Sequence, residues 1–347
     1  MKALLLSQYR QLEIADLPAP TPGPDEILVQ VAACGICGSD VHGYDGSTGR
    51  RIPPIVMGHE AAGLVSAVGS AATKFSAGER VTFDSTVFCA ACDYCLRGEI
   101  NLCDNRNVLG VSCGDYSRAG AFAEYVLVPQ HIVHRLPASL SYPEAAMLEA
   151  VSVALHGVSL SKIVPGQTAL VVGAGMIGLL TMQALRVAGC ARVFAADIDA
   201  SRLHMATNLG ATATFLAAGA ELASQIAQLT NGRGVDVAVE AVGISETVRT
   251  AVDCVRKGGT VTLVGNLAPE VTLPLQKVVT RQIRLQGSCS SAGEYPQAIA
   301  LVASGQIQVK PLITAVAPLA DGALWFERLY AREPNLMKVV LTPTTPE

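Results

Sequence analysis

The pattern of hydrophobic and polar residues changes character near residue 150. Up to about residue 137, short runs of alternating apolar and polar residues are separated by glycine and proline, which is typical of β-strands joined by tight turns. Lys2–Ser7 and Glu26–Ala33 are predicted strands of this kind, and the proline-rich turn Pro18–Pro24 lies between them. The first part of the chain is therefore expected to be largely β.

After Pro165 and Gly166, short apolar runs alternate with longer helical stretches, which predicts a doubly wound parallel sheet. Its strands are expected near residues 168–172, 192–196, 213–216, 235–239, 260–264 and 283–287. Ser141 is a predicted N-cap, with Pro143 in the first turn and Glu144 three residues after the cap, and this helix is expected to run towards Gly157. From about Ala292 the chain mixes a helix with short strands, and we expect it to return to the first domain.

A glycine-rich turn follows the first predicted strand of the sheet, where Gly173, Gly175 and Gly178 form G-x-G-x-x-G. The first glycine allows a tight turn, the second lets the backbone approach a pyrophosphate, and the third lets the helix pack closely on the sheet. That helix directs free N–H groups and the positive end of its dipole at the phosphates. Asp197 ends the second strand, nineteen residues after Gly178, where a carboxylate accepts the ribose 2′-hydroxyl of NAD.

The turn, helix, second strand and acid together predict a dinucleotide site. Further contacts with the dinucleotide are expected from the loop itself and from the carboxyl ends of the fourth and fifth strands, namely from Met176, Ile177, Val242, Val264 and Gly265.

Length and composition exclude several classes of protein. At 347 residues two domains are expected, and an apolar fraction of 50% with 5% aromatic residues excludes disorder. The net charge of −4, with both signs dispersed, argues against nucleic acid or an anionic membrane as a partner. The uncharged stretch between Lys162 and Arg186 is interrupted by Pro165 and by glycines, so no membrane span is expected there.

Charged residues within the first 17 positions do not fit a signal peptide, and we expect a cytoplasmic protein. In that compartment ten cysteines indicate metal binding or catalysis rather than disulfides.

Four cysteines have the spacing C-x2-C-x2-C-x7-C, at Cys89, Cys92, Cys95 and Cys103. Four thiolates so close in sequence can surround Zn2+ tetrahedrally and leave no open position, which is what a structural zinc site requires. Zinc would stabilise the segment Asp84–Gly110, which has little apolar material. Buried or redox-active thiols are the alternative, and the regular spacing favours zinc.

A second set of candidate ligands is dispersed, with CGICGSDVH at residues 34–42 and GHE at residues 58–60. By themselves Cys34 and Cys37 could equally form a thioredoxin-like redox pair, and His59 could be an ordinary loop histidine.

Taken in order and spacing, CGICGSDVH, GHE, the four-cysteine segment and GAGMIG resemble the zinc-dependent medium-chain dehydrogenases. The most similar branch comprises polyol dehydrogenases such as sorbitol and galactitol-phosphate dehydrogenase, and the resemblance covers essentially the whole chain. It implies a Rossmann doubly wound parallel sheet inserted into a GroES-like β-barrel catalytic domain. The catalytic domain is expected at residues 1–150 and 290–347 and the Rossmann domain at residues 151–289, with NAD and two zinc ions per chain.

The resemblance also implies the ligands of a catalytic zinc, namely Cys37, His59 and Glu60. Glu149 matches a fourth carboxylate that binds the metal directly or through its water, although an ordinary helix glutamate is the alternative. The family usually has proline after this glutamate, and this chain has Ala150.

Other roles follow from the same resemblance. Asp40 is expected to orient His59, Ser39 to accept the proton of the alcohol, and His42 to end that proton relay. A turn-forming Ser-Asp pair and a surface histidine are the alternatives. Arg202 is expected near the adenosine ribose, or else as a solvated helix charge.

The resemblance implies hydride transfer between NAD and a secondary alcohol, either a polyol or a sugar. Sorbitol dehydrogenase has an Arg-Tyr pair where this chain has Ser290 and Ser291, so the substrate is expected to differ. The alternatives are oxidation of a 3-hydroxy amino acid, as in threonine dehydrogenases, and a non-catalytic redox sensor that binds zinc and dinucleotide. The sheet edge near Thr260–Gly287 is expected to pair across a two-fold axis in a homodimer or homotetramer.

Overall fold

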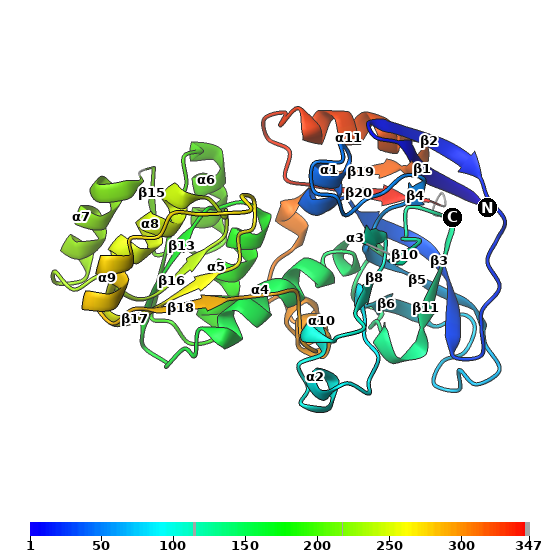
Figure 1. Cartoon of the computed structure of the whole chain (residues 1–347), viewed down its shortest axis with the longest axis horizontal. Coiled ribbons are helices and arrows are strands. Elements are labelled where there is room, and N and C mark those ends of the chain that lie inside the picture. Colours follow the sequence, from blue (N-terminus) through cyan, green and yellow to red (C-terminus); the bar gives the residue numbers. More distant parts are fainter. Residues whose placement is uncertain (114–115, 217, 344–347) are drawn as a thin grey trace. The chain divides into compact units, whose positions relative to one another are not determined.

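A computed structural model describes residues 1–113, 116–216 and 218–343 (Figure 1). The chain divides into two compact units. Unit 1 comprises Met1–Glu149, Tyr295–Ala303 and Val309–Glu347, and unit 2 comprises Ala150–Glu294 and Ser304–Gln308. The last four residues of the catalytic domain expected at 290–347 lie outside the described residues.

Unit 1 is built on a seven-stranded sheet. The central strand β3 (Glu26–Gly35) alternates buried and half-buried residues, as its sequence pattern predicts for a strand with one face in the core. From one edge to the other the strands are β12 (Val133–Arg135), β6 (Arg80–Phe83), β5 (Glu60–Val68), β3, β20 (Lys338–Thr342) and β19 (Ile313–Pro318), with β11 (Tyr125–Pro129) also paired to β3.

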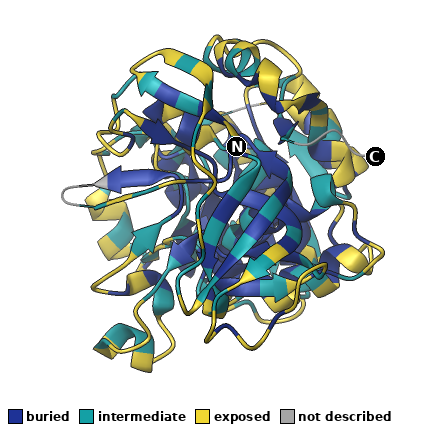
Figure 2. Cartoon of the chain, turned by 90° about the vertical axis from the view of Figure 1, so that its right-hand side faces the viewer, coloured by how far each residue is buried: buried dark blue, intermediate teal, exposed yellow. Residues whose placement is uncertain are grey.

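Smaller elements complete unit 1. A three-stranded sheet joins β2 (Gln11–Asp16), β1 (Lys2–Gln8) and β4 (Ile55–Val56), and two ribbons pair β7 (Thr86–Val87) with β8 (Asn107–Val108) and β9 (Val111–Cys113) with β10 (Tyr116–Arg118). The α-helices are α1 (Gly38–Gly43), α2 (Asp93–Leu96), α3 (Tyr142–Ala145), α10 (Tyr295–Ala303) and α11 (Gly322–Tyr330). Buried residues concentrate on the strands, whereas many loops carry exposed ones (Figure 2).

Unit 2 contains the predicted six-stranded parallel sheet. Its strands in spatial order are β15 (Ala213–Phe215), β14 (Arg192–Ala196), β13 (Thr168–Val172), β16 (Val235–Glu240), β17 (Val255–Leu263) and β18 (Arg284–Gly287). Numbered within this unit, the order is 3-2-1-4-5-6, which is the Rossmann arrangement. The sheet predicted from the sequence is confirmed.

The helices of unit 2 bury apolar faces against this sheet. Leu222 and Ile226 of α7 and Val252 of α8 belong to the same core cluster as Leu170 of β13. The helices are α5 (Met176–Val187), α6 (Ala200–Asn208), α7 (Gly219–Leu229), α8 (Ser245–Cys254) and α9 (Leu275–Thr280), and the boundary between the units falls inside α4 (Leu148–Leu160). No helix within the described ranges is long and apolar enough to cross a membrane.

Two predicted boundaries are wrong in detail. The capping box between Ser141 and Glu144 is present, but α3 ends at Ala145 and a new helix, α4, begins at Leu148. The single helix expected to run from Ser141 towards Gly157 is therefore two helices. Strand β17 begins at Val255 rather than near 260, and its pairing with β16 shifts register between Val235 and Val237.

Candidate active site and nucleotide site

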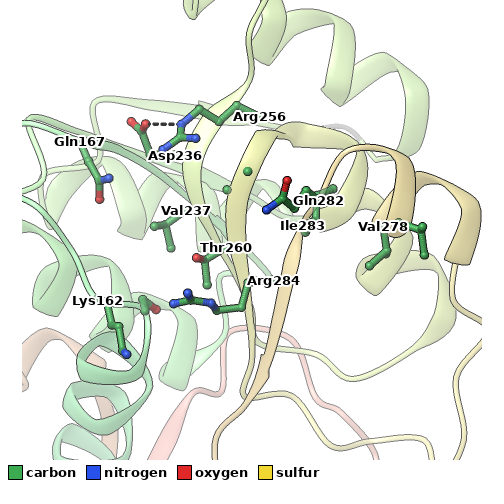
Figure 3. Close-up of a pocket in the computed structure, with 14 residues that line it drawn as sticks. Lys162, Gln167, Asp236, Val237, Arg256, Thr260, Val278, Gln282, Ile283 and Arg284 are labelled. Carbon is green, nitrogen blue, oxygen red and sulfur yellow. Dashed lines mark hydrogen bonds and ion pairs between the residues drawn. The ribbon is translucent and has the colours of Figure 1, made fainter.

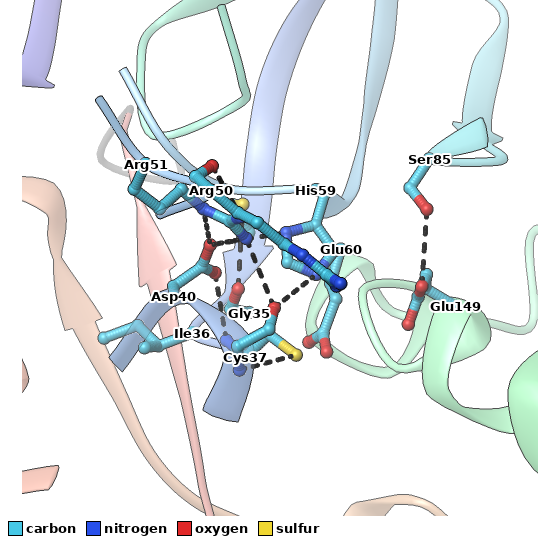
Figure 4. A network of polar contacts seen from close by, with 12 residues as sticks. Gly35, Ile36, Cys37, Asp40, Arg50, Arg51, His59, Glu60, Ser85 and Glu149 are labelled. Atoms are coloured by element: carbon cyan, nitrogen blue, oxygen red, sulfur yellow. Dashed lines mark hydrogen bonds and ion pairs between the residues drawn. The ribbon is translucent and has the colours of Figure 1, made fainter. Parts of the chain in front are cut away.

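The pairing of β3 with β5 assembles a cluster of metal-binding side chains in unit 1 (Figure 4). Gly35, at the end of β3, lies opposite Glu60, at the start of β5, so the residues that follow β3 lie beside those that precede β5. As a result, one ligand atom each from Cys37, His59 and Glu60 lies within 4.8 Å of the others. Sulfur, nitrogen and oxygen ligands in such a group suit Zn2+.

Asp40 connects this cluster to helix α1. Its Oδ2 accepts a hydrogen bond from the backbone N–H of Cys37 at 3.3 Å, and its Oδ1 lies 3.4 Å from His59 Nδ1. Burial favours the neutral acid, but His59 and Arg51 outweigh it and hold the pKa of Asp40 well below its usual range. The ionised carboxylate lies beside Nδ1, where its charge can orient the imidazole ring, although no hydrogen bond joins them in the described structure.

The electrostatics of His59 favour a cation at this place. Burial would lower the pKa of His59, but Asp40 and Cys37 raise it well above the usual value. A metal ion would take the place of the proton that these two groups attract, since metal ligands bind in deprotonated form.

Arg51 is a part of the site that the sequence did not reveal. Its guanidinium, only 4% exposed, donates to Asp40 Oδ1 at 2.9 Å and to Ser39 Oγ at 3.2 Å. Ser39 Oγ also lies 3.5 Å from His59 Nε2, so the structure brings the predicted proton acceptor to the cluster. His42 is exposed on α1, and no hydrogen bond between its ring and Ser39 occurs in the described structure.

Glu149 lies apart from the close group of three ligands. Its Oε1 accepts a hydrogen bond from Ser85 Oγ at 3.3 Å, and the group of ligand atoms within 4.8 Å found in the described residues does not include it. Burial raises the pKa of Glu149 to about 7, and Glu60 and Asp84 add to this effect while His59 opposes it. Glu149 is therefore close enough to His59 and Glu60 for their charges to shift its pKa.

A buried ion pair adjoins the same cluster. The ammonium group of Lys338, at the start of β20, donates to Glu60 Oε2 and to the carbonyl oxygen of Ile36. Burial lowers the pKa of Lys338, but Glu60 and Cys37 raise it by more, so the ammonium form of the lysine is favoured.

The four cysteines predicted to bind zinc form a separate cluster. One ligand atom each from Cys89, Cys92, Cys95 and Cys103 lies within 4.8 Å of the others, and all four are free thiols. Backbone N–H groups also point at the sulfurs, for example from Cys92 to Cys89 at 3.3 Å and from Cys89 to Cys103 at 3.3 Å. Hydrogen bonds from the N–H groups of Ala91 and Cys92 lower the pKa of Cys89 to about 6, which favours the thiolate.

The glycine turn of unit 2 has the geometry that its spacing predicts. Gly173 has a φ of +98°, which disfavours other residues. A Cβ on Gly178 would lie 1.8 Å from the carbonyl oxygen of Gly173, so only glycine lets α5 approach the strand this closely. A Cβ on Gly175, the N-cap of α5, would meet no atom within 4 Å. The backbone there is open to a ligand.

Asp197 lies directly after β14 and faces this turn. It is 8% exposed, and its two oxygens accept hydrogen bonds from the N–H groups of Ala174 at 2.6 Å and Asp199 at 2.9 Å. Arg202 lies 3.8 Å from Asp197 and 3.6 Å from Asp199 and is about half exposed. One arginine is thus shared between two carboxylates.

A buried glutamate, which the sequence analysis missed, organises the neighbouring loops. Glu240 ends β16, and its Oε1 accepts hydrogen bonds from the N–H groups of Val242 and Gly243, both at 2.8 Å. Its carbonyl oxygen accepts from Val264 at 2.9 Å and Gly265 at 3.0 Å, which holds the ends of β16 and β17 together. In the sequence, this role could have been inferred from the position of Glu240 at the end of the apolar run VDVAVE, where the strand stops.

A cavity in unit 2 lies at the amino ends of the parallel strands, opposite the carboxyl ends that carry the glycine turn and Asp197 (Figure 3). It measures about 610 Å3 and is lined by residues near the amino ends of the strands, including Asp236, Thr260 and Arg284. The glycine turn and Asp197 follow the carboxyl ends of β13 and β14. This cavity is therefore distinct from the predicted dinucleotide site.

A Rossmann sheet with a glycine turn, next in sequence to a β unit with two groups of metal-binding side chains, defines a zinc-dependent dehydrogenase. Comparisons with known families agree. Residues 23–138 match the alcohol dehydrogenase GroES-like domain, and residues 177–304 match the zinc-binding dehydrogenase domain.

Individual relatives extend over nearly the whole chain. A probable D-xylulose reductase A of Emericella nidulans is 36% identical over 334 residues, covering 94% of this chain and 92% of the relative. Sorbitol dehydrogenase of Bacillus subtilis is 35% identical over 347 residues, covering 99% and 97%. A solved structure of a putative zinc-binding dehydrogenase from Sinorhizobium meliloti 1021, bound to NADP, has a TM-score of 0.89 and 34% identity, covering 99% of each chain.

The chain belongs to the zinc-dependent medium-chain alcohol dehydrogenases, in the branch that includes sorbitol dehydrogenase and D-xylulose reductase. It is an oxidoreductase of a class that uses zinc and a pyridine nucleotide.

Gly178 packs against backbone, whereas Gly175 has open space beside it. Substituting each in turn therefore separates the effect of packing on stability from the effect of backbone approach on nucleotide binding. Gly178→Ala should lower the free energy of unfolding of the nucleotide-free protein by about 1–3 kcal/mol, because the methyl group collides with backbone. Gly175→Ala should leave that free energy nearly unchanged but weaken NADH binding. Thermal unfolding and NADH fluorescence titration measure the two effects. Wild-type NADH affinity in Gly175→Ala would contradict the close approach of the pyrophosphate.

Proposed function

We propose that this protein is an NAD- and zinc-dependent dehydrogenase that interconverts a secondary alcohol, either a polyol or a sugar alcohol, and its ketone. The convergence of Cys37, His59 and Glu60 at the ends of β3 and β5 carries this proposal. Three protein ligands with one exchangeable position are the arrangement that a catalytic zinc requires.

The residues present fit a zinc ion. Glu60 Oε1 is buried and has no hydrogen-bond partner in the described parts of the chain, and a metal would provide one. Cys37, His59 and Glu60 would hold the ion, and Glu149 would bind it directly or through its water molecule. Cys89, Cys92, Cys95 and Cys103 would hold a second, structural zinc.

When bound, a zinc ion would supply a Lewis acid that favours ionisation of the substrate hydroxyl, and the nicotinamide would supply the hydride acceptor. Ser39 Oγ accepts the hydroxyl proton, and Arg51 holds this oxygen in place by donating a hydrogen bond to it. Because no hydrogen bond joins Ser39 to the His42 ring in the described structure, the proton would cross a further hydroxyl or water before it reached His42, which is exposed on the same helix. Asp40 fixes the orientation of His59 throughout.

A substrate panel tests this function. The relatives named as sorbitol dehydrogenase and D-xylulose reductase favour a polyol over a 3-hydroxy amino acid. Hydride transfer should therefore be faster with C4 to C6 alditols or their ketoses than with threonine, followed as NADH absorbance. Ser290 and Ser291 in place of an Arg-Tyr pair should give a preference different from that of sorbitol dehydrogenase. Turnover of threonine alone would contradict the proposal.

Substitution of single cysteines separates the two proposed zinc sites. Purified protein should hold about two zinc ions per chain. Cys37→Ser should keep the structural zinc and NADH binding but lose turnover about a thousandfold or more, since Lewis-acid catalysis is worth several kcal/mol. Cys95→Ser should instead reduce thermal stability and soluble yield. Metal analysis and steady-state kinetics provide the readouts, and full activity in Cys37→Ser would contradict the catalytic site.

Asp197 is proposed to select NAD over NADP. Its carboxylate can accept the ribose hydroxyls, whereas a 2′-phosphate would bring about two negative charges against it. Arg202 is already shared with Asp199 and cannot offset both. An uncompensated contact between a carboxylate and a phosphate costs on the order of several kcal/mol, and about 2.8 kcal/mol corresponds to a hundredfold difference in affinity. The Sinorhizobium meliloti neighbour was solved bound to NADP, so similarity to the family does not by itself fix the choice of cofactor.

The ratio of kcat/KM for NAD and NADP should therefore be about a hundred or more. Asp197→Ser should reduce this ratio by weakening NAD and removing the repulsion of NADP. Equal use of both cofactors by the wild type would place Asp197 away from the ribose.

We also propose a homodimer or a homotetramer. Strand β18 ends the sheet order and pairs with β17 in the described structure, and its other edge offers backbone groups for pairing. On the adjacent α9, Leu275 is 66% and Val279 67% exposed. Light scattering at micromolar concentration should give a mass of two or four chains, and a monomer would contradict this assembly.

A further inference from the structure

The buried Lys338–Glu60 pair has no role in the chemistry described so far. Lys338 is 1% exposed, and its ammonium group donates to Glu60 Oε2 and, at 3.0 Å, to the carbonyl oxygen of Ile36. A buried lysine is costly unless it is paired and hydrogen-bonded, and this one is both. Its partner is one of the three proposed ligands of the catalytic zinc.

The fold builds the space for this pair through Gly35. Gly35 lies opposite Glu60 in the pairing of β3 with β5, and opposite Val340 in the pairing of β3 with β20. A Cβ on Gly35 would lie 2.4 Å from Glu60 Oε2 and 3.4 Å from Lys338 Cδ. The absence of a side chain in β3 therefore lets a lysine from β20 reach a glutamate from β5.

This arrangement makes the two oxygens of Glu60 inequivalent. Oε2 is held by Lys338, whereas Oε1 is buried without a hydrogen-bond partner in the described ranges. We propose that Lys338 is a positioning residue, which restricts Glu60 to one oxygen towards the zinc and so keeps a position open for substrate. The inference rests on the proposed zinc site at Cys37, His59 and Glu60.

The charge balance supports the same role. A Cys37 thiolate and a Glu60 carboxylate would together neutralise Zn2+ if they held it. The ammonium of Lys338 donates to that carboxylate and draws negative charge away from the metal position. Without it, the ligands would place more negative charge on a bound zinc, which would then be a weaker Lewis acid.

A structural role and a positioning role predict opposite results for Lys338→Met. If Lys338 only stabilises the fold, its loss should loosen the site and speed the release of zinc. If it restrains Glu60, its loss frees Oε2 for the metal and leaves a more negative site. Zinc release to a chelator should then slow by roughly tenfold, which is the size of effect that partners of metal ligands commonly have.

Cobalt provides a spectroscopic readout that does not depend on turnover. In the Co2+-substituted protein, Lys338→Met should weaken the visible d–d absorption, because binding through both oxygens raises the coordination number from four to five. Lys338→Arg keeps the positive charge and should retain the wild-type spectrum and release rate. Lys310→Met, which removes an exposed lysine of the same unit, is the matched control and should change neither.

Gly35→Ala displaces the pair without changing its charge and should shift the cobalt spectrum even if Lys338→Met does not fold. Zinc should leave the two proposed sites in separate kinetic phases. The phase that is absent in Cys37→Ser belongs to the proposed catalytic site. Unchanged or faster zinc release in folded Lys338→Met, or an unchanged spectrum in Gly35→Ala, would overturn the inference. If the wild type instead lacks that release phase, the proposed catalytic zinc itself fails.

Discussion

The chemistry of this protein depends on burying several charges at the junction of β3 and β5. Asp40 and Glu60 are 0% and 1% exposed, and each is matched by a buried cation, Arg51 and Lys338 respectively. The free-energy cost of removing charges from water is offset only when oppositely charged partners are close and well oriented. The sheet pairing meets this condition, because it aligns the end of one strand with the start of its neighbour and admits a third strand beside Gly35. The three proposed zinc ligands are held by the same alignment.

The two cations act on different parts of the site. Arg51 donates both to Asp40, which orients His59, and to Ser39 Oγ, the proposed proton acceptor, so it couples the orientation of a ligand to the path of the proton. Lys338 acts on Glu60 instead. A site that only had to retain a metal would gain from as many anionic ligands as possible. The balance of anions and cations here is consistent with the proposed site, in which one position on the metal stays open for an exchangeable ligand.

Unit 2 forms its proposed nucleotide site from backbone groups rather than from buried charges. Its parallel strands bring their carboxyl ends to one edge, where loops from β13, β14, β16 and β17 meet. Glycine at positions 173 and 178 permits the close packing that leaves α5 pointing its first N–H groups into this edge. Glu240 ties two of the loops together by accepting backbone hydrogen bonds. A rigid edge of this kind can hold a long ligand without a deep cavity.

The features that the sequence by itself determined are local ones. The positions of the strands of the parallel sheet follow from short apolar runs, the glycine turn from fixed spacing, and the four-cysteine cluster from residues only fourteen positions apart. Cys37, His59 and Glu60 were identified through their resemblance to a family, since their spacing alone left other interpretations open.

Only the tertiary structure decided the contacts between distant residues. Lys338 lies 278 residues from Glu60, and nothing near either residue in sequence indicates the pair. Arg51 is one of two adjacent arginines in a loop, and only the fold shows which of them is buried against Asp40. The separation of Glu149 from the three close ligands, and the break between α3 and α4 before it, also depend on packing. Patterns of polarity record which face of an element is buried, whereas the identity of its partner is set by strand pairing across the whole chain.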